Sequence, residues 1–197
     1  MLFNSVSFLI FLPIVYLLYW FVFNRNYKYQ NMLLLLASFY FYACWDWRFL
    51  FLLIFSIGLD FLSGLRIEKS RTKKEALFWL TLSICINLGF LGFFKYYNFF
   101  AESFASLVGG FGFKANVWLL NIILPVGISF YTFHGLSYII DIYKKRITAE
   151  KNFTDYAVFV SYFPLLVAGP IERATHLLPQ IQQKRVFNES LTADGMR

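Results

Sequence analysis

The sequence is organised around the stretch LPVGISFYTFHGLSYIIDIYKKR, which runs from Leu124 to Arg146. It is apolar enough to lie in a membrane, yet it contains a proline, two glycines, a histidine and an aspartate. At helical spacing, residues separated by four, three, four and three positions share one stripe: Gly127, Tyr131, His134, Tyr138 and Asp141. A polar stripe is costly in lipid unless it faces protein or water. We therefore expect this stripe to line an interior surface around which the other apolar segments pack.

The composition is that of an integral membrane protein. Of the 197 residues, 59% are hydrophobic and only 15% are charged, whereas roughly a quarter of the residues in a soluble domain are charged. The net charge of +7 comes from basic residues in short clusters between long apolar runs, as in cytoplasmic loops. The aromatic residues lie inside those runs rather than among the basic clusters, so nucleic acid is not expected as a partner.

The apolar runs predict an all-α, polytopic membrane helix bundle that forms a single transmembrane domain over residues 1–197. About five runs are long enough to cross a bilayer, and a sixth is short and broken. Pro125 and Gly127 are expected to divide the fifth run, and Pro164 to interrupt the sixth, which suits a re-entrant piece buried against protein. The predicted segments are Phe3–Phe23, Gln30–Trp45, Phe49–Leu65, Ala76–Phe94, Val117–Tyr143 and Thr154–Ala168.

The connections carry further local signals. Trp45 to Arg48 reads as a tight polar link, and either Asn152 or Thr154 as the N-cap of the short segment. The glycine-rich residues 101–116 are expected to lie along the membrane interface. Gly89 and Gly92 are predicted to form a close-packing face. The two cysteines, Cys44 and Cys85, are expected to be small buried residues without a disulfide.

The basic residues predict the orientation of the chain. With the N-terminus outside, the three loops on the inner side carry eleven Lys and Arg residues against three outside. The inner residues are Arg25, Lys28, Arg66, Lys69, Arg71, Lys73, Lys74, Lys144, Lys145, Arg146 and Lys151, and the outer ones are Arg48, Lys95 and Lys114.

Several ionisable residues inside or beside the apolar runs are candidates for a site. Asp60 is either a functional carboxyl or one that neighbouring helices satisfy. His134 is either a functional base, oriented by its neighbours on the stripe, or a structural hydrogen-bonding residue. Glu172 and Arg173 follow a broken segment and either face an aqueous tunnel or form an interfacial ion pair. His176, four residues after Glu172, reads as a loop hydrogen bond, since two residues are too few for a metal site.

Four blocks in order resemble the membrane-bound O-acyltransferase (MBOAT) family. The first two blocks are FYFYACWDWRFL at 39–50 and FFKYYNF at 93–99, which are similar to the bacterial branch that includes alginate O-acetyltransferases and the teichoic-acid D-alanyl transfer protein. The other two are LPVGISFYTF at 124–133 with Ser137, Tyr138 and Asp141, and FPLLVAGPI at 163–171 with Leu178-Pro-Gln. The resemblance covers essentially the whole chain.

The resemblance implies a multi-helix enzyme of the bacterial inner membrane that moves an acyl group through a tunnel to a hydroxyl on the far side. For the alginate-type branch it implies an acetyl group, a donor such as acetyl-CoA as substrate, and no bound cofactor or metal. The implied acceptor is an exported polysaccharide, with periplasmic acetyltransferases as partner proteins. The stripe and the charged pair become tunnel candidates: Tyr131, His134, Tyr138, Asp141, Glu172 and Arg173.

The family's catalytic histidine belongs to a later Trp-His motif, which neither His134 nor His176 matches. The residues from Asn188 begin like a helix, so the chain is interpreted as the truncated N-terminal part of a larger domain and is expected to be inactive alone. The polar faces of Asp60 and His134 are then expected to stay exposed until further helices cover them. A membrane transporter and a non-catalytic scaffold are the alternatives; an inverted repeat would favour the transporter.

Overall fold

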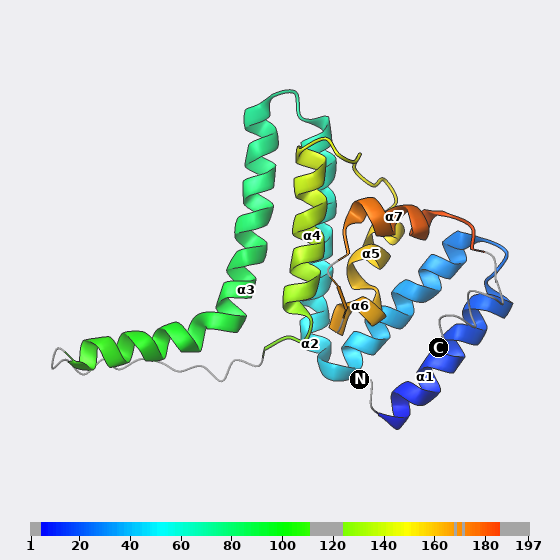
Figure 1. Ribbon diagram of the computed structural model, residues 1–197, viewed down its shortest axis with the longest axis horizontal. Helices are drawn as coiled ribbons and strands as arrows, with labels where there is room; N and C mark the ends of the chain where they lie inside the picture. Colours follow the sequence, from blue (N-terminus) through cyan, green and yellow to red (C-terminus); the bar gives the residue numbers. More distant parts are fainter. Residues whose placement is uncertain (1–4, 111–123, 168, 171, 186–197) are drawn as a thin grey trace.

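The computed structural model describes residues 5–110, 124–167, 169–170 and 172–185, and every regular element among them is helical (Figure 1). The all-α prediction is thus confirmed for the described residues. Predictions for residues 111–123, including Lys114, and for 186–197 lie outside them. The elements are α1 Val6–Leu17, the π-helix η1 Leu18–Val22, α2 Tyr27–Lys69, α3 Lys73–Gly110, α4 Ile128–Tyr143, α5 Phe153–Ser161, α6 Phe163–Val167 and α7 Ala174–Gln182.

Helix α2 consists of two arms that meet at Asp46. This residue has extended backbone angles (φ −157°, ψ 112°), which break the helical hydrogen-bond ladder, and the two arms diverge from it in Figure 1. The Asp46 carboxylate accepts hydrogen bonds from the backbone N–H of Arg48 at 3.0 Å and from its guanidinium at 2.7 Å. The predicted link from Trp45 to Arg48 between two apolar segments is therefore confirmed.

Helix α3 is long but buries little of its surface. Its buried residues recur at steps of three and four along one seam, namely Leu80, Ser83, Asn87 and Leu91. Its last part bends away from the other helices in Figure 1. The prediction that Gly89 and Gly92 form a close-packing face is wrong for the described residues. A Cβ placed at either glycine would have no packing partner among them within 4 Å. The prediction that the cysteines are buried is also wrong, because Cys44 and Cys85 are both exposed free cysteines.

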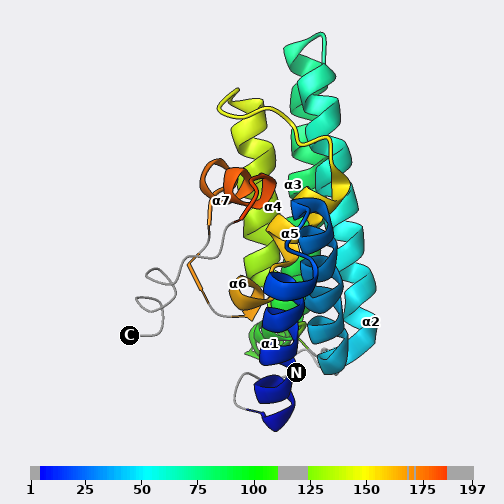
Figure 2. The same ribbon diagram turned by 90° about the vertical axis from the view of Figure 1, so that its right-hand side faces the viewer.

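Helix α4 occupies the centre of the molecule. Gly127 has the left-handed conformation (φ 77°) that glycine adopts without strain, and the helix begins at the next residue, as predicted; the predicted lead over residues 117–123 lies outside the described residues. A Cβ on Gly127 would lie 2.4 Å from the Leu166 carbonyl oxygen, a second reason for glycine there. Figures 1 and 2 show α4 beside the second arm of α2, and α3 and α5 also contact it.

The short segment after α4 is broken and buried, as predicted. Asn152 caps α5 by accepting a hydrogen bond from the Thr154 N–H at 3.0 Å. The break falls at Tyr162, which has an extended ψ of 110°, rather than at Pro164. Proline is tolerated in the first turn of a helix, and Pro164 occupies the first turn of α6. All side chains from Asp155 to Ser161 are buried.

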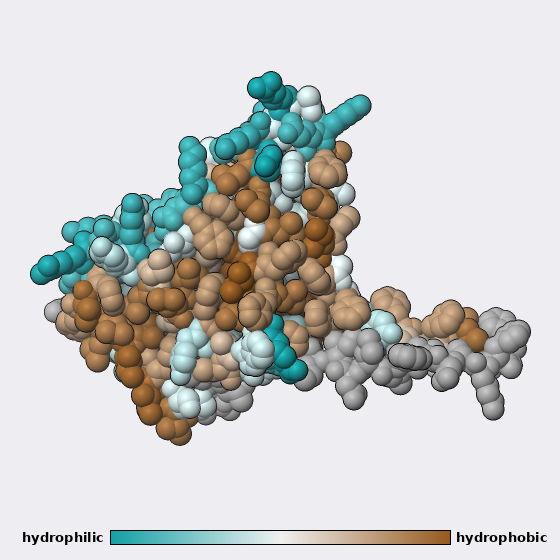
Figure 3. All heavy atoms as spheres, turned by 180° about the vertical axis from the view of Figure 1, so that it is seen from behind, coloured by the Kyte–Doolittle hydropathy of each residue, from teal (hydrophilic) through white to brown (hydrophobic). Residues whose placement is uncertain are grey.

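The face of the molecule that Figure 3 shows is largely apolar away from one end, with a few polar residues lower down. Figure 3 shows hydrophilic residues gathered along the end that carries the turn between α2 and α3, while the body below it is mainly hydrophobic. Within the described residues, two helices are long and apolar enough to cross a membrane, Tyr27–Lys69 and Lys73–Gly110, and α1 with η1 forms a shorter apolar helix. A large apolar surface over helices of this length is typical of a membrane protein.

Candidate functional site

The polar stripe of α4 faces the interior of the molecule. Tyr131, His134, Tyr138 and Asp141 are all buried, and the side chain of His134 is completely so. Asp60 on α2 is also completely buried. The expectation that these polar faces stay exposed is therefore wrong. The reason is that α5 folds back against α4 and α2, while α3 packs along their other side, so that helices of this chain cover both faces.

His134 connects α4 to the segment that precedes α7. Its Nε2 accepts a hydrogen bond from the backbone N–H of Glu172 at 3.2 Å, although 38 positions separate the two residues. Its ring lies 5.6 Å from that of Phe159 on α5. Since a ring nitrogen that accepts a hydrogen bond carries no proton, this geometry requires the proton of a neutral ring to be on Nδ1. The structure thus brings His134 and Glu172, two of the six predicted site residues, into contact.

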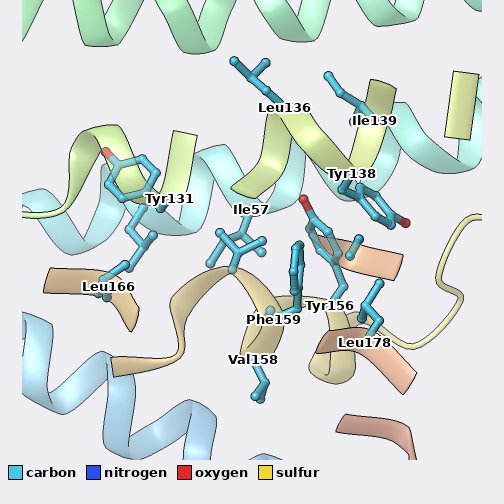
Figure 4. Packing of buried hydrophobic residues seen from close by; sticks show 14 of the residues in the cluster. Ile57, Tyr131, Leu136, Tyr138, Ile139, Tyr156, Val158, Phe159, Leu166 and Leu178 are labelled. Atoms are coloured by element: carbon cyan, nitrogen blue, oxygen red, sulfur yellow. The ribbon is translucent and has the colours of Figure 1, made fainter. Parts of the chain in front are cut away.

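Tyr138 lies one turn further along α4, in an aromatic pair. Its ring centroid is 4.4 Å from that of Tyr156 on α5, and Figure 4 shows the two rings side by side. Its hydroxyl oxygen accepts a hydrogen bond from the Glu150 N–H at 2.8 Å. On the other side, Gly64 of α2 lets the helices approach closely, because a Cβ there would lie 2.8 Å from the Tyr138 ring.

The other candidates are spread over a wider region. Tyr131 packs near Leu166 at the opposite end of the cluster in Figure 4. Asp141 forms an ion pair with Arg146 at 3.0 Å. The Glu172 carboxylate contacts His176 at 2.9 Å, which confirms the predicted loop pair, whereas Arg173 is exposed at the start of α7. The six residues therefore form a buried stripe and a separate charged surface joined by the His134–Glu172 bond.

Asp60 is held by a polar network that the sequence analysis found only in part. Its Oδ1 accepts hydrogen bonds from the Ser83 hydroxyl and, at 2.8 Å, from the Asn87 side-chain amide of α3. Ser56 extends the network by donating to the Asn87 oxygen at 2.5 Å. The prediction that neighbouring helices satisfy Asp60 is therefore confirmed for Oδ1 only, because the buried Oδ2 atom has no hydrogen-bond partner among the described residues. The sequence analysis missed Ser83 and Asn87, although two polar residues four positions apart in an apolar helix indicate a buried polar face.

Gly135 is also part of this contact between α2 and α4. A Cβ at Gly135 would lie 1.9 Å from the Asp60 Oδ2 atom, so α4 passes directly against the carboxylate. Only a residue without a side chain fits at this position.

A second buried network ties the beginning of α2 to α5 and α7. The Asn31 amide donates to the Asp155 carboxylate at 2.7 Å and to the Ile181 carbonyl at 3.0 Å. Arg185 in turn donates to the Asn31 oxygen at 2.8 Å. These partners lie more than 120 positions apart, which is why no local pattern indicated them.

The described residues contain no group of three or more His, Cys, Asp and Glu side chains placed to hold a metal ion. They do form a cavity of about 710 Å³ at the hydrophilic end and a shallower apolar one of about 450 Å³ on α3. None of the six tunnel candidates lines either cavity, although Arg146, the ion-pair partner of Asp141, lines the first one, so the tunnel stays a prediction.

Comparison with known proteins places the chain beside a group of bacterial acetylases. It is 41% identical to the probable alginate O-acetylase AlgI of Pseudomonas aeruginosa over 93% of its own length and 35% of that protein. Identity to the AlgI of Azotobacter vinelandii is also 41%, over 93% of the chain and 36% of that protein. The peptidoglycan O-acetyltransferase of Helicobacter pylori is 33% identical, over 93% of the chain and 39% of that protein.

The chain thus spans a little over a third of the length of these relatives. No protein-family model matches it, and no solved structure matches it significantly. The relatives carry the names of O-acetyltransferases and confirm the resemblance that the four sequence blocks predicted.

Proposed function

We propose that this chain, which is related to the alginate O-acetylase branch of the MBOAT family, forms part of a membrane enzyme that O-acetylates an exported polysaccharide. The observation that carries the proposal is the identity of about 40% to alginate O-acetylases over nearly all of the chain. The described helices support it, because they form an apolar body with a buried polar centre, as an enzyme that works inside a bilayer requires.

The proposed reaction is transfer of an acetyl group from a thioester donor, acetyl-CoA or a similar molecule, to a sugar hydroxyl. The hydroxyl oxygen attacks the acyl carbon, the C–S bond breaks, and the thiolate leaves with its electron pair. A general base takes the hydroxyl proton during the attack. The family resemblance assigns that base to a histidine outside residues 1–197, and periplasmic acetyltransferases would act as partner proteins.

The stripe of α4 then has a supporting role. His134 accepts its hydrogen bond from the backbone that leads into α7, and Asp60 joins α2 to α3. These bonds keep four helices in fixed positions, and a tunnel wall needs such fixed positions to align two substrates. In this proposal Tyr131, His134, Tyr138 and Asp141 belong to the wall, and Glu172 with Arg173 lies at its polar mouth.

The proposed topology is multi-pass, with about five spans and the N-terminus outside the inner membrane. The support is that the turn after α2 and the turn after α4 lie at the same end of the molecule (Figures 1 and 3), and that these turns with their flanking helix ends carry nine of the eleven basic residues predicted to lie inside. Reporter fusions at residues 47, 70 and 147 would test this. Residues 70 and 147 should report the cytoplasm and residue 47 the periplasm; the opposite pattern would overturn the orientation.

The functional test is complementation. The complete gene product that contains these residues would be expressed in a P. aeruginosa strain that lacks AlgI, and ester-linked acetyl on the exported alginate would be measured. We expect acetylation to return. Membranes that contain the protein at normal abundance but alginate without acetyl would contradict alginate as acceptor. The same assay on peptidoglycan would then distinguish another polysaccharide from a protein without transfer activity.

A further inference from the structure

We infer that the cavity at the hydrophilic end binds the phosphate headgroup of an anionic phospholipid. The cavity has a volume of about 710 Å³ and lies between the turn that joins α2 to α3 and the turn that follows α4. It therefore sits where membrane-spanning helices meet basic loops, which is the level of lipid headgroups. The inference does not rest on acyl transfer, since the site is described by its own residues.

The charge of the cavity lining selects an anion. Four basic residues line it, Arg71, Lys73, Lys145 and Arg146, against one acidic residue, Glu68. Arg146 is engaged with Asp141, whereas the other three form no ion pair within the described part of the chain. Three cations around one cavity without anionic partners favour a ligand that brings negative charge.

Backbone and hydroxyl groups in the same wall suit a phosphate in particular. Helix α3, which begins at Lys73, presents its N-terminal turn to the cavity through Thr72, Lys73 and Ala76. The N–H groups of a first helical turn and the helix dipole attract anionic oxygens. Thr148 also lines the cavity, and its hydroxyl can donate to a phosphate oxygen, whereas the Ser70 hydroxyl donates to the Arg66 carbonyl at 2.7 Å.

The backbone at Lys145 is a second, independent observation. The Arg146 N–H donates to the Asp141 carbonyl and the Lys145 N–H to the Ile142 carbonyl, which is the Schellman arrangement at a helix end. The residue at its left-handed position is ordinarily glycine, but here it is Lys145, with φ 56°. A strained residue of this kind points to a functional constraint. Lys145 lines the cavity, and a role of its positive charge there accounts for a lysine at a glycine position.

The apolar part of the lining distinguishes a lipid from a free phosphate. Ile67, Ile142 and Ile147 line the same cavity as the basic residues. A small hydrated anion gains nothing from such a surface, whereas the glycerol and upper acyl carbons of a phospholipid bury apolar area against it. Basic pockets between membrane helices are known to take anionic headgroups for this reason.

The test uses the full-length protein purified in mild detergent. Its melting temperature would be followed during titration with short-chain phosphatidylglycerol, and separately with phosphatidylcholine, inorganic phosphate and coenzyme A. A ligand that binds only the folded state raises the melting temperature in a saturable way. We expect a saturable rise with phosphatidylglycerol alone. A rise with phosphate or coenzyme A and none with phosphatidylglycerol would overturn the lipid assignment, and equal rises with both phospholipids would overturn anion recognition.

Two triple variants that remove equal charge test the location. In R71Q/K73Q/K145Q all three residues line the cavity, whereas in K69Q/K74Q/K144Q the three residues lie on the same turns outside it. Each basic residue near an anionic surface contributes several-fold to affinity, so we expect the first variant to bind phosphatidylglycerol on the order of 100-fold more weakly. The second should bind almost normally. Equal losses in both would show a general surface attraction and overturn the site.

Lys145→Gly separates binding from folding. Glycine fits the left-handed position better than lysine, so the variant should melt at the same or a higher temperature without lipid. We expect it nevertheless to bind phosphatidylglycerol several-fold more weakly. Unchanged lipid affinity in this variant would contradict the role of the Lys145 ammonium.

Discussion

Helices α4 and α3 are both apolar, yet they are used in opposite ways. Ten of the sixteen residues of α4 are buried, including five polar or ionisable ones, Tyr131, Thr132, His134, Tyr138 and Asp141. Only four residues of the much longer α3 are buried, and large side chains such as Phe78 and Phe93 face outward. Hydrophobicity alone therefore does not identify the inner helix of this membrane protein.

Polar and small residues distinguish the inner surfaces instead. On α3 the buried seam contains Ser83 and Asn87, which are the residues that bind Asp60. On α4 the close contact with Asp60 occurs at Gly135. In lipid an apolar side chain is equally well placed facing outward, whereas a polar one must face protein, so polar residues mark the packed face.

The largest expected effect is at the glycine that touches Asp60. In Gly135→Ala the new Cβ would lie 1.9 Å from the Asp60 Oδ2 atom, so α4 must move away from α2. We expect the free energy of unfolding to fall by about 3 kcal/mol, as for overpacked cores. It would be measured by titrating the purified protein from mild detergent into SDS.

Gly89→Ala on α3 is the matched control, because no described atom lies within 4 Å of its Cβ. Alanine is the better helix former by about 1 kcal/mol, so this variant should be as stable as the original or more so. If Gly135→Ala and Gly89→Ala lowered the free energy of unfolding equally, the contrast between a packed face of α4 and an open face of α3 would be wrong.

The Asp60 network should show the next largest effect. Asp60→Ala leaves the Ser83 hydroxyl buried without its acceptor and leaves the Asn87 amide with the Ser83 carbonyl as acceptor, at a cost of about 2 kcal/mol. Asp60→Asn retains the Oδ1 acceptor and should cost clearly less in the same unfolding titration. If the two substitutions destabilise equally, a charge rather than an acceptor is needed at this position.

His134 should affect activity to a moderate degree. His134→Ala removes the acceptor for the Glu172 N–H, and loss of one such bond corresponds to about 1 kcal/mol. We expect the full-length variant to keep partial acetylation, reduced roughly five-fold by that energy, as measured on exported polysaccharide. His134→Gln offers an oxygen acceptor and should recover part of the loss. Complete inactivity of both His134 variants at normal abundance would show that His134 takes part in catalysis.

The smallest effect is expected on the outer face of α3. Phe78 is 60% exposed, so Phe78→Leu exchanges one lipid-facing apolar side chain for another. The free energy of unfolding should change by less than about 0.5 kcal/mol. Phe159→Leu, at a completely buried position on α5, provides the comparison and should cost about 1 kcal/mol. A larger loss at Phe78 would show that another protein surface covers this face.

Local chemistry was sufficient to predict the helix boundaries that depend on a few neighbouring residues. The breaks at Asp46 and at Pro125 with Gly127, and the Asn152 cap, follow from backbone preferences and short-range hydrogen bonds. The positions of Gly89 and Cys85 were not predictable in this way. A small residue in an apolar helix fits a close contact and a lipid-facing surface equally well.

The sequence by itself determined that this is a helical membrane protein related to bacterial O-acetylases, and that the stripe of α4 turns inward. Both follow from composition, helical period and the order of four motifs. Only the tertiary structure decided what the stripe meets: Glu172 at His134, the Asp60 carboxylate at Gly135, and Glu150 at Tyr138. Helical period gives the direction in which a side chain points, but its partner depends on how distant helices dock, and that is set by the packing of all of them together.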